Sequence, residues 1–193
     1  MDHLRSYFKK NPVIAAVRNR GDLTKALSSK AIALFVLSGT IACLSEIMEK
    51  ARNNDKLVFL HIDLIKGIAS DRAGVNYLAQ NNLCDGIVST RSKLIQAAQK
   101  KDLMAVQRLF LLDSAALNSG ENMIKSNDPD AIEILPGVAA PYFIDHVSKQ
   151  HDCPIIAGGL IRKEKEVRDL TEEGVMAVSS SERDLWNLNL EKK

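Results

Sequence analysis

The sequence predicts an α/β protein, a compact (β/α)₈ TIM barrel with eight parallel strands. Three observations predict it. Eight short runs rich in Val, Ile and Leu recur along the chain, and a stretch with the apolar spacing of a helix follows each run. No unit carries a long insertion, which favours the closed barrel over an open doubly wound sheet.

The eight runs are nearly continuous in apolar character, which is typical of strands buried on both faces of a parallel sheet. They span residues 13–17, 34–37, 57–64, 86–89, 104–111, 131–135, 154–157 and 176–179. Dividing the 193 residues among eight units gives about 24 residues per unit, against roughly 31 in a barrel of usual length. We therefore expect short helices and short loops. We expect residues 1–12 to form a helical N-terminal segment and residues 13–193 to form one barrel domain.

Helix start signals stand before several of the segments between the runs. Thr40 and Ser92 each precede an apolar stretch, and residues 181–184 read Ser-Glu-Arg-Asp. The last string matches a capping box. It predicts a helix that begins near Glu182, directly after the eighth strand.

Composition excludes several classes of protein. The 26 Lys and Arg residues against 24 Asp and Glu residues give a formal charge of +2, so bulk electrostatic binding of nucleic acid is not expected. The three Cys residues, at positions 43, 84 and 153, argue against a disulfide framework or zinc ribbon and fit a reducing cytosol. The chain shows neither a membrane-spanning run nor a signal peptide. We expect a cytoplasmic protein without a membrane partner, and the sequence makes no prediction of its oligomeric state.

The strongest functional signal lies after the seventh and eighth strands. Gly158 and Gly159 let the backbone approach an anion and aim N–H groups at it. Ser180 and Ser181 add hydroxyl donors, and the helix expected near Glu182 adds free N–H groups. The alternative is that the glycines form a tight turn and the serines cap a helix. Barrels of this type bind phosphate at these two loops, so the joint pattern favours an anion site.

Charged residues follow the other strand ends. The basic ones are Arg18, Lys66, Arg91, Arg108 and Arg162, and the acidic ones are Asp63 and Glu133. A mouth with this excess of positive charge suits a small anion such as a phosphorylated polyol or sugar. For Arg108 and Glu133, an ion pair inside the barrel top that contacts no ligand is the alternative, because buried charges need partners.

His61 and Asp63 alternate along one strand and therefore share a face. Such a pair suits a divalent metal, and Asp63 with Lys66 suits proton transfer. A second set of ligands is missing, so we predict neither a metal site nor a catalytic set. His61 is interpreted as a hydrogen-bonded structural residue.

Six strings of the sequence, at residues 16–19, 61–67, 89–91, 107–114, 132–137 and 157–162, resemble the glycerol-3-phosphate-responsive antiterminator family of bacteria. The resemblance runs from about Asn11 to Trp186, and the strings at 107–114 and 133–137 are the specific ones. It implies a regulator rather than an enzyme, with no cofactor. The effector would be glycerol 3-phosphate, and the partner would be the leader mRNA of a glycerol operon, in which premature termination is prevented.

By the same resemblance, the phosphate would fall on Gly159, Ser180 and Ser181. The glycerol end would face Glu133 and Asp63. Two other functions stay open: a sugar-phosphate epimerase, isomerase or lyase on the same barrel, and a phosphate-binding barrel that acts through a protein partner. Basic clusters at residues 9–10, 18–20, 100–101 and 192–193 are candidate RNA contacts, although each is more simply a solvated surface.

Overall fold

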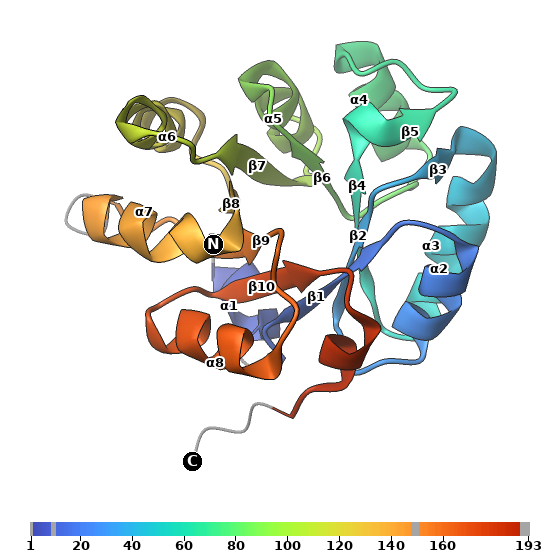
Figure 1. The fold of residues 1–193 in the computed structure, drawn as a ribbon. Helices are drawn as coiled ribbons and strands as arrows, with labels where there is room; N and C mark the ends of the chain where they lie inside the picture. The colour runs from blue at the N-terminus through green and yellow to red at the C-terminus, as the bar shows by residue number, and fades with distance from the viewer. Residues whose placement is uncertain (1, 9–10, 148–150, 190–193) are drawn as a thin grey trace.

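The structure, a computed structural model, describes residues 2–8, 11–147 and 151–189. Eight parallel strands close into a barrel in the spatial order β1, β10, β9, β8, β7, β6, β4, β2. Figure 1 shows the helices arranged around this ring of strands. The closed barrel predicted from the sequence is confirmed.

The strands of the barrel are short and almost wholly buried, as the continuous apolar runs indicated. They are β1 (Val13–Val17), β2 (Ala33–Val36), β4 (Leu57–His61), β6 (Gly86–Ser89), β7 (Met104–Phe110), β8 (Ala131–Leu135), β9 (Ile155–Gly158) and β10 (Ala177–Ser180). The predicted runs at 34–37, 154–157 and 176–179 are each displaced by one residue. The cause is that a residue flanking a strand is often as apolar as the strand itself.

The predicted strand over 57–64 is too long. β4 ends at His61, a 3₁₀ helix η2 (Ile62–Leu64) follows, and β5 (Ile65–Lys66) pairs with β3 (Gly39–Thr40) in a separate two-stranded sheet. Ile62 and Ile65 are buried in the main hydrophobic cluster. The apolar run therefore continued past the strand because these two residues pack in the core without extending the barrel strand.

Eight α-helices and three further 3₁₀ helices lie in the described part of the chain. They are α1 (Asp2–Phe8), α2 (Arg20–Leu27), η1 (Ile41–Cys43), α3 (Leu44–Arg52), α4 (Arg72–Gln80), α5 (Ser92–Gln99), α6 (Ser114–Asn127), η3 (Gly137–Ala139), α7 (Ala140–Val147), α8 (Glu164–Glu172) and η4 (Arg183–Asn187). Side chains of Asn19, Asp71 and Asp113 cap α2, α4 and α6 by accepting backbone N–H groups, which satisfies donors that a helix leaves free at its start.

No α-helix follows β10 within residues 2–8, 11–147 and 151–189, so the capping-box prediction at 181–184 is wrong. Only η4 forms there, and no side chain caps it. Local bonding explains the difference. The Ser180 hydroxyl accepts the N–H of Glu182 at 3.1 Å, and the indole N–H of Trp186 donates to the carbonyl of Ser180 at 2.8 Å. These bonds hold the chain in a short turn against the barrel.

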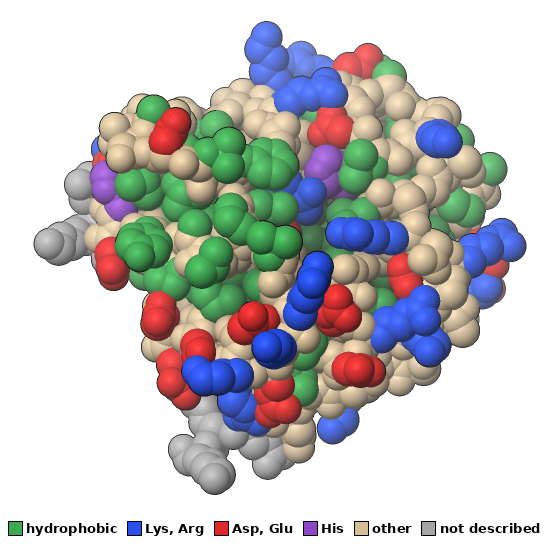
Figure 2. All heavy atoms as spheres, in the orientation of Figure 1, with side chains coloured by type: hydrophobic (Ala, Val, Ile, Leu, Met, Phe, Trp, Pro, Cys, Tyr) green, Lys and Arg blue, Asp and Glu red, His purple; other side chains and the backbone are tan. Residues whose placement is uncertain are grey.

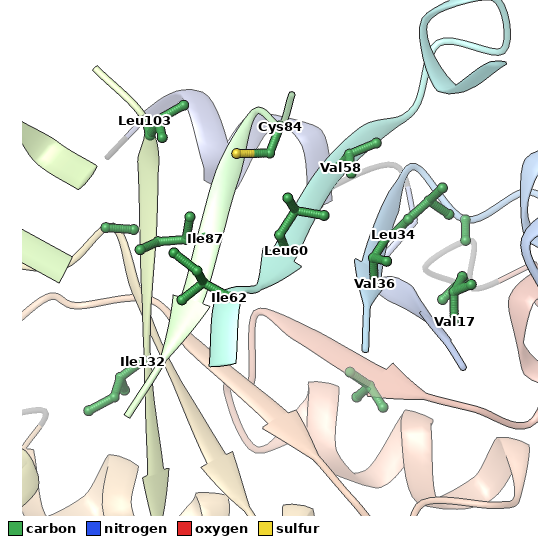
Figure 3. Packing of buried hydrophobic residues seen from close by; sticks show 14 of the residues in the cluster. Val17, Leu34, Val36, Val58, Leu60, Ile62, Cys84, Ile87, Leu103 and Ile132 are labelled. Carbon is green, nitrogen blue, oxygen red and sulfur yellow. The ribbon is translucent and has the colours of Figure 1, made fainter. Parts of the chain in front are cut away.

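Two hydrophobic clusters form the core. The smaller one fills the barrel with residues such as Phe35, Phe59 and Val106, and it includes Leu4 and Phe8 of α1. Figure 1 shows α1 behind the strands, so this helix closes the amino-terminal end of the barrel. The larger cluster lies between the strands and their surrounding helices, and Figure 3 shows part of it.

In the same described residues, no helix is both long enough and apolar enough to cross a bilayer.

Candidate ligand site at the barrel mouth

The inward faces of four strands change from apolar to polar toward their carboxyl ends, and a fifth strand, β9, ends in a glycine at the same level. Side chains two residues apart on a strand share a face. The pairs are Phe59 and His61, Val106 and Arg108, Ala131 and Glu133, Ile156 and Gly158, and Ala177 and Ser179. The second members form a polar layer at the end of the barrel that carries function in this fold.

Glu133 lies at the centre of this layer, with 1% of its surface exposed. One carboxylate oxygen accepts Arg108 Nε at 2.6 Å, and the other accepts the Ser179 hydroxyl at 2.6 Å. A Cβ at Gly158 would come within 2.5 Å of the Glu133 carboxylate. Gly158 is therefore needed for the close approach of β9 to Glu133. The internal ion pair that the sequence left as an alternative is present.

Sequence reasoning missed Ser179 as a member of the site. The sequence pattern that could have predicted it is the alternation of Ala177 and Ser179 along one face of the strand. This alternation places the Ser179 hydroxyl one layer above the apolar interior.

His61 is buried, and its Nδ1 atom has no hydrogen-bond partner among the described residues. The nearest carboxylate oxygen recorded for it is Oδ2 of Asp63, at 3.9 Å. Burial, followed by the Arg108 cation, lowers the pKa of His61 below its ordinary value. His61 is therefore neutral near pH 7. The interpretation of His61 as a hydrogen-bonded structural residue is therefore wrong for Nδ1, for which the described residues supply no hydrogen bond.

Asp63 and Arg91, both predicted ligand residues, bind each other. Arg91 Nη2 donates to Oδ1 of Asp63, and Arg91 Nη1 donates to the carbonyl of Ser70 at 2.9 Å. The Ser89 hydroxyl donates to Oδ2 of Asp63 at 3.0 Å and accepts the backbone N–H of Arg91 at 3.1 Å. Ser89 was not expected here. Its place as the last residue of β6, across from Asp63, was the available signal.

The backbone N–H groups of the turn after β9 fall into two sets, those that donate to a protein acceptor and those that do not. The N–H groups of Arg162 and Lys163 both donate to Oε2 of Glu166, at 2.7 and 2.9 Å, and these bonds lower the pKa of Glu166. Gly159 and Leu160 adopt left-handed conformations with φ of 77° and 62°. Gly159 directly follows the pairing of Gly158 with Ser179 at the end of the β9–β10 ladder. The N–H groups of Leu160 and of Ser181, which follows β10, have no acceptor among the described residues.

The hydroxyl of Ser180 has a structural partner. It donates to the carbonyl of Ile161 at 2.8 Å while accepting the N–H of Glu182. Ser180 thus ties the turn after β9 to the end of β10, and its predicted contact with a ligand stays a prediction.

Three cations of the mouth are exposed and have no ion pair in the described residues: Arg18 after β1, Lys66 in β5 and Arg162 after β9. Figure 2 shows Lys and Arg side chains bordering a central hollow, and hydrophobic side chains gathered over α6 and α7. Exposed apolar residues that follow β7, β8 and β9 are Leu112, Val138 and Leu160. The mouth therefore has one basic side and one apolar side.

Other chemistry is sparse in the part of the chain that the structure describes. No three His, Cys, Asp or Glu side chains gather there as metal ligands would. Cys43, Cys84 and Cys153 are free thiols, and burial raises the pKa of Cys84 and of Cys153 to about 12.

Fold and site together define a class of protein: a (β/α)₈ barrel with unbonded backbone N–H groups and cations without ion pairs among the described residues at the carboxyl ends of its strands. The chain belongs to the glycerol-3-phosphate responsive antiterminator family, whose family model matches residues 13–186. The resemblance noted from the sequence is thereby confirmed.

Individual relatives agree with the family. The chain is similar to the uncharacterized protein YgcP of Escherichia coli (strain K12), with 34% identity over 93% of this chain and 94% of that protein. It is similar in structure to the glycerol uptake operon antiterminator regulatory protein of Listeria monocytogenes, with 34% identity, a TM-score of 0.84, and coverage of 91% of this chain and 95% of that chain. A glycerol uptake operon antiterminator-related protein of Thermotoga maritima has 29% identity and a TM-score of 0.79, with coverage of 90% and 96%.

An N-acetylmannosamine-6-phosphate 2-epimerase of Clostridium perfringens, at 16% identity and a TM-score of 0.66 over 92% of this chain and 88% of that one, shares the fold alone.

Proposed function

We propose that this protein binds glycerol 3-phosphate at the barrel mouth and, in that state, binds the leader mRNA of glycerol-utilisation genes so that transcription passes a terminator. The observation that carries the proposal is the pair of unbonded N–H groups of Leu160 and Ser181 just beyond the ends of two paired strands. Backbone N–H groups without internal acceptors are good donors to a phosphate oxygen.

The cationic side chains support the same ligand. Arg162, Arg18 and Lys66 can reach an anion without first breaking an ion pair, because none has one in the described residues. A guanidinium binds two phosphate oxygens at once. The glycerol hydroxyls would then lie toward the polar layer, where Nδ1 of His61 and the guanidinium of Arg108 are the available groups.

Two engaged carboxylates favour binding over catalysis. Asp63 is held by Arg91 and Ser89, and Glu133 is held by Arg108 and Ser179. A general acid or base needs a carboxyl group free to exchange a proton with substrate. The arrangement therefore supports a regulator rather than an enzyme, as the antiterminator family does.

Calorimetric titration tests the ligand. We expect glycerol 3-phosphate to bind, and glycerol to bind much more weakly because it lacks the charged group. Arg162→Gln should weaken binding by about tenfold or more, as expected for loss of a charge-assisted hydrogen bond. Arg168→Gln is the matched control, because Arg168 is paired with Glu164 on α8. No heat and no thermal shift at millimolar glycerol 3-phosphate would contradict the proposal.

Filter binding of the leader transcript from the source organism tests the partner. We expect affinity to rise when glycerol 3-phosphate is present. Equal affinity with and without saturating ligand would remove the regulatory part of the proposal.

A further inference from the structure

A basic groove lies beside the mouth, between the start of α4 and the exposed face of α5. It has a volume of about 510 Å³, and its charged lining residues are Arg72, Arg91, Lys93, Lys100 and a single acid, Asp71. The Asp71 carboxylate caps α4 by accepting the N–H of Gly74 at 2.8 Å. Four cations therefore face one carboxylate that is already engaged, on a protein whose formal charge is only +2.

The spacing on α5 makes this groove a linear array. Lys93, Gln96 and Lys100 are exposed and follow the i, i+3, i+7 pattern of one helical face. A rise of about 1.5 Å per residue puts the backbone positions of Lys93 and Lys100 about 10 Å apart along the helix. Within the described residues, neither lysine nor Arg72 has an ion pair.

We propose that this groove binds the sugar-phosphate backbone of a single RNA strand, an inference that rests on the proposed function. Charge complementarity selects the occupant. A groove that follows a strand by its phosphates needs unpaired Lys and Arg along its length. A protein partner would instead favour an apolar and aromatic centre with few lysines, and the lining of this groove has no aromatic residue.

Arg91 connects the groove to the ligand mouth. Its guanidinium lines the groove and donates to the carbonyl of Ser70 and to the carboxylate of Asp63 at the mouth. A ligand that changes the position or charge environment of Asp63 therefore also changes a cation of the groove. In this way the two sites share one residue, which is a physical route for the coupling that a ligand-dependent RNA-binding protein needs.

The test of the groove compares two double variants of the full chain. Fluorescence anisotropy measures their affinity for labelled leader RNA, with glycerol 3-phosphate present and at several salt concentrations. Lys93→Gln with Lys100→Gln should weaken binding by about tenfold or more. It should also reduce the slope of log affinity against log salt by about 1.4, because each single-strand phosphate contact contributes about 0.7. Lys25→Gln with Lys165→Gln removes the same charge from α2 and α8 and should change neither quantity.

Each other outcome overturns the assignment. A groove variant that binds leader RNA like the wild type removes the groove and leaves the proposed function standing, whereas a wild-type protein that binds no leader RNA removes both. An equal loss in the control variant would show that only net charge matters. In a last outcome, the wild type binds polyglutamate as tightly as RNA, and the groove variant loses both affinities equally. That result would assign the groove to an acidic protein surface.

The role of Arg91 is tested with Arg91→Lys. We expect the ratio of RNA affinity at saturating glycerol 3-phosphate to RNA affinity without it to fall toward one, because the single nitrogen of a lysine does not reproduce the separate contacts that two guanidinium nitrogens make with Ser70 and Asp63. A retained effect would contradict the coupling role. Loss of glycerol 3-phosphate binding would show that Arg91 is a ligand contact, and would contradict it equally.

Discussion

Glu133 holds a negative charge almost out of contact with water, and its two oxygens each accept one short hydrogen bond, from Arg108 and from Ser179. Removing either charge alone leaves the other buried without compensation. The pair therefore restricts which substitutions the polar layer can accept, and it holds the end of β7 against the ends of β8 and β10.

Glu133→Gln should lower the free energy of unfolding by about 3–5 kcal/mol, the usual cost of leaving a buried charge unpaired. Urea unfolding measures this change. Arg108→Met combined with Glu133→Gln should cost clearly less than the sum of the two single substitutions, because no unpaired charge remains. Additive effects would contradict the account of the pair.

His61 gives a prediction on pH. Its pKa in the folded protein is lowered by burial and by Arg108, so between that value and the ordinary value of about 6.5 the unfolded chain binds more protons. The free energy of unfolding should therefore fall as the pH is lowered below about 6.5.

The measurement is the free energy of unfolding of wild type and His61→Asn between neutral and mildly acidic pH. The variant should show a shallower fall. His146→Asn is the control and should keep the part of the fall that belongs to His61. Identical pH slopes in wild type and His61→Asn would disprove the role of burial.

At the scale of elements, the two ends of the barrel differ in what covers them. α1 covers the amino-terminal end by inserting Leu4 and Phe8 into the inner cluster, whereas the carboxyl-terminal end stays polar and open to a ligand. Two sets of hydrogen bonds hold the turn after β9. The Glu166 carboxylate accepts two backbone N–H groups of the turn, and the Ser180 hydroxyl donates to one of the turn's carbonyls. The remaining N–H groups of the turn are thus kept at fixed positions by the scaffold.

Phe8→Ala should lower the free energy of unfolding by about 3–5 kcal/mol, as expected for truncating a buried aromatic side chain. Phe8 is 3% exposed. Tyr77→Ala, at a tyrosine of α4 that is 46% exposed, should have a small effect. Denaturant unfolding of both variants measures the difference, and a small loss for Phe8→Ala would show that α1 does not close the barrel in solution.

At the scale of the whole molecule, the proposed RNA groove begins beside the proposed ligand mouth at the carboxyl-terminal end of the barrel and continues along α5 toward Lys100. A ligand can change RNA affinity only by interacting differently with the two states of that end. The ion pair of Arg91 with Asp63 joins a lining residue of the groove to a residue of the proposed mouth.

Thermodynamic linkage gives the corresponding prediction. The factor by which glycerol 3-phosphate raises the affinity for leader RNA must equal the factor by which the RNA raises the affinity for glycerol 3-phosphate. Two calorimetric titrations with the ligand, without RNA and with saturating RNA, measure the second factor. A clear inequality of the two factors would show that the response is not a property of this protein and its two ligands alone.

Much of the barrel followed from the sequence because a strand buried on both faces must be apolar throughout, and such a run can be recognised locally. The positions of Gly159 and Arg162 at strand ends also followed, since each lies next to its strand along the chain. The capping box expected at residues 181–184 is absent, and the helix beside Glu182 is a short 3₁₀ helix. The hydrogen bonds of the Trp186 indole and the Ser180 hydroxyl, which depend on the packed barrel, determine the backbone there.

The sequence by itself determined the class of fold and the excess of cations that follow the carboxyl ends of the strands. Only the tertiary structure decided which of those charges are free. Arg108 and Glu133 become neighbours through the register of β7 with β8, and Arg91 reaches Asp63 across 28 residues of chain. Side-chain partners of this kind depend on three-dimensional distance, which local sequence patterns do not contain.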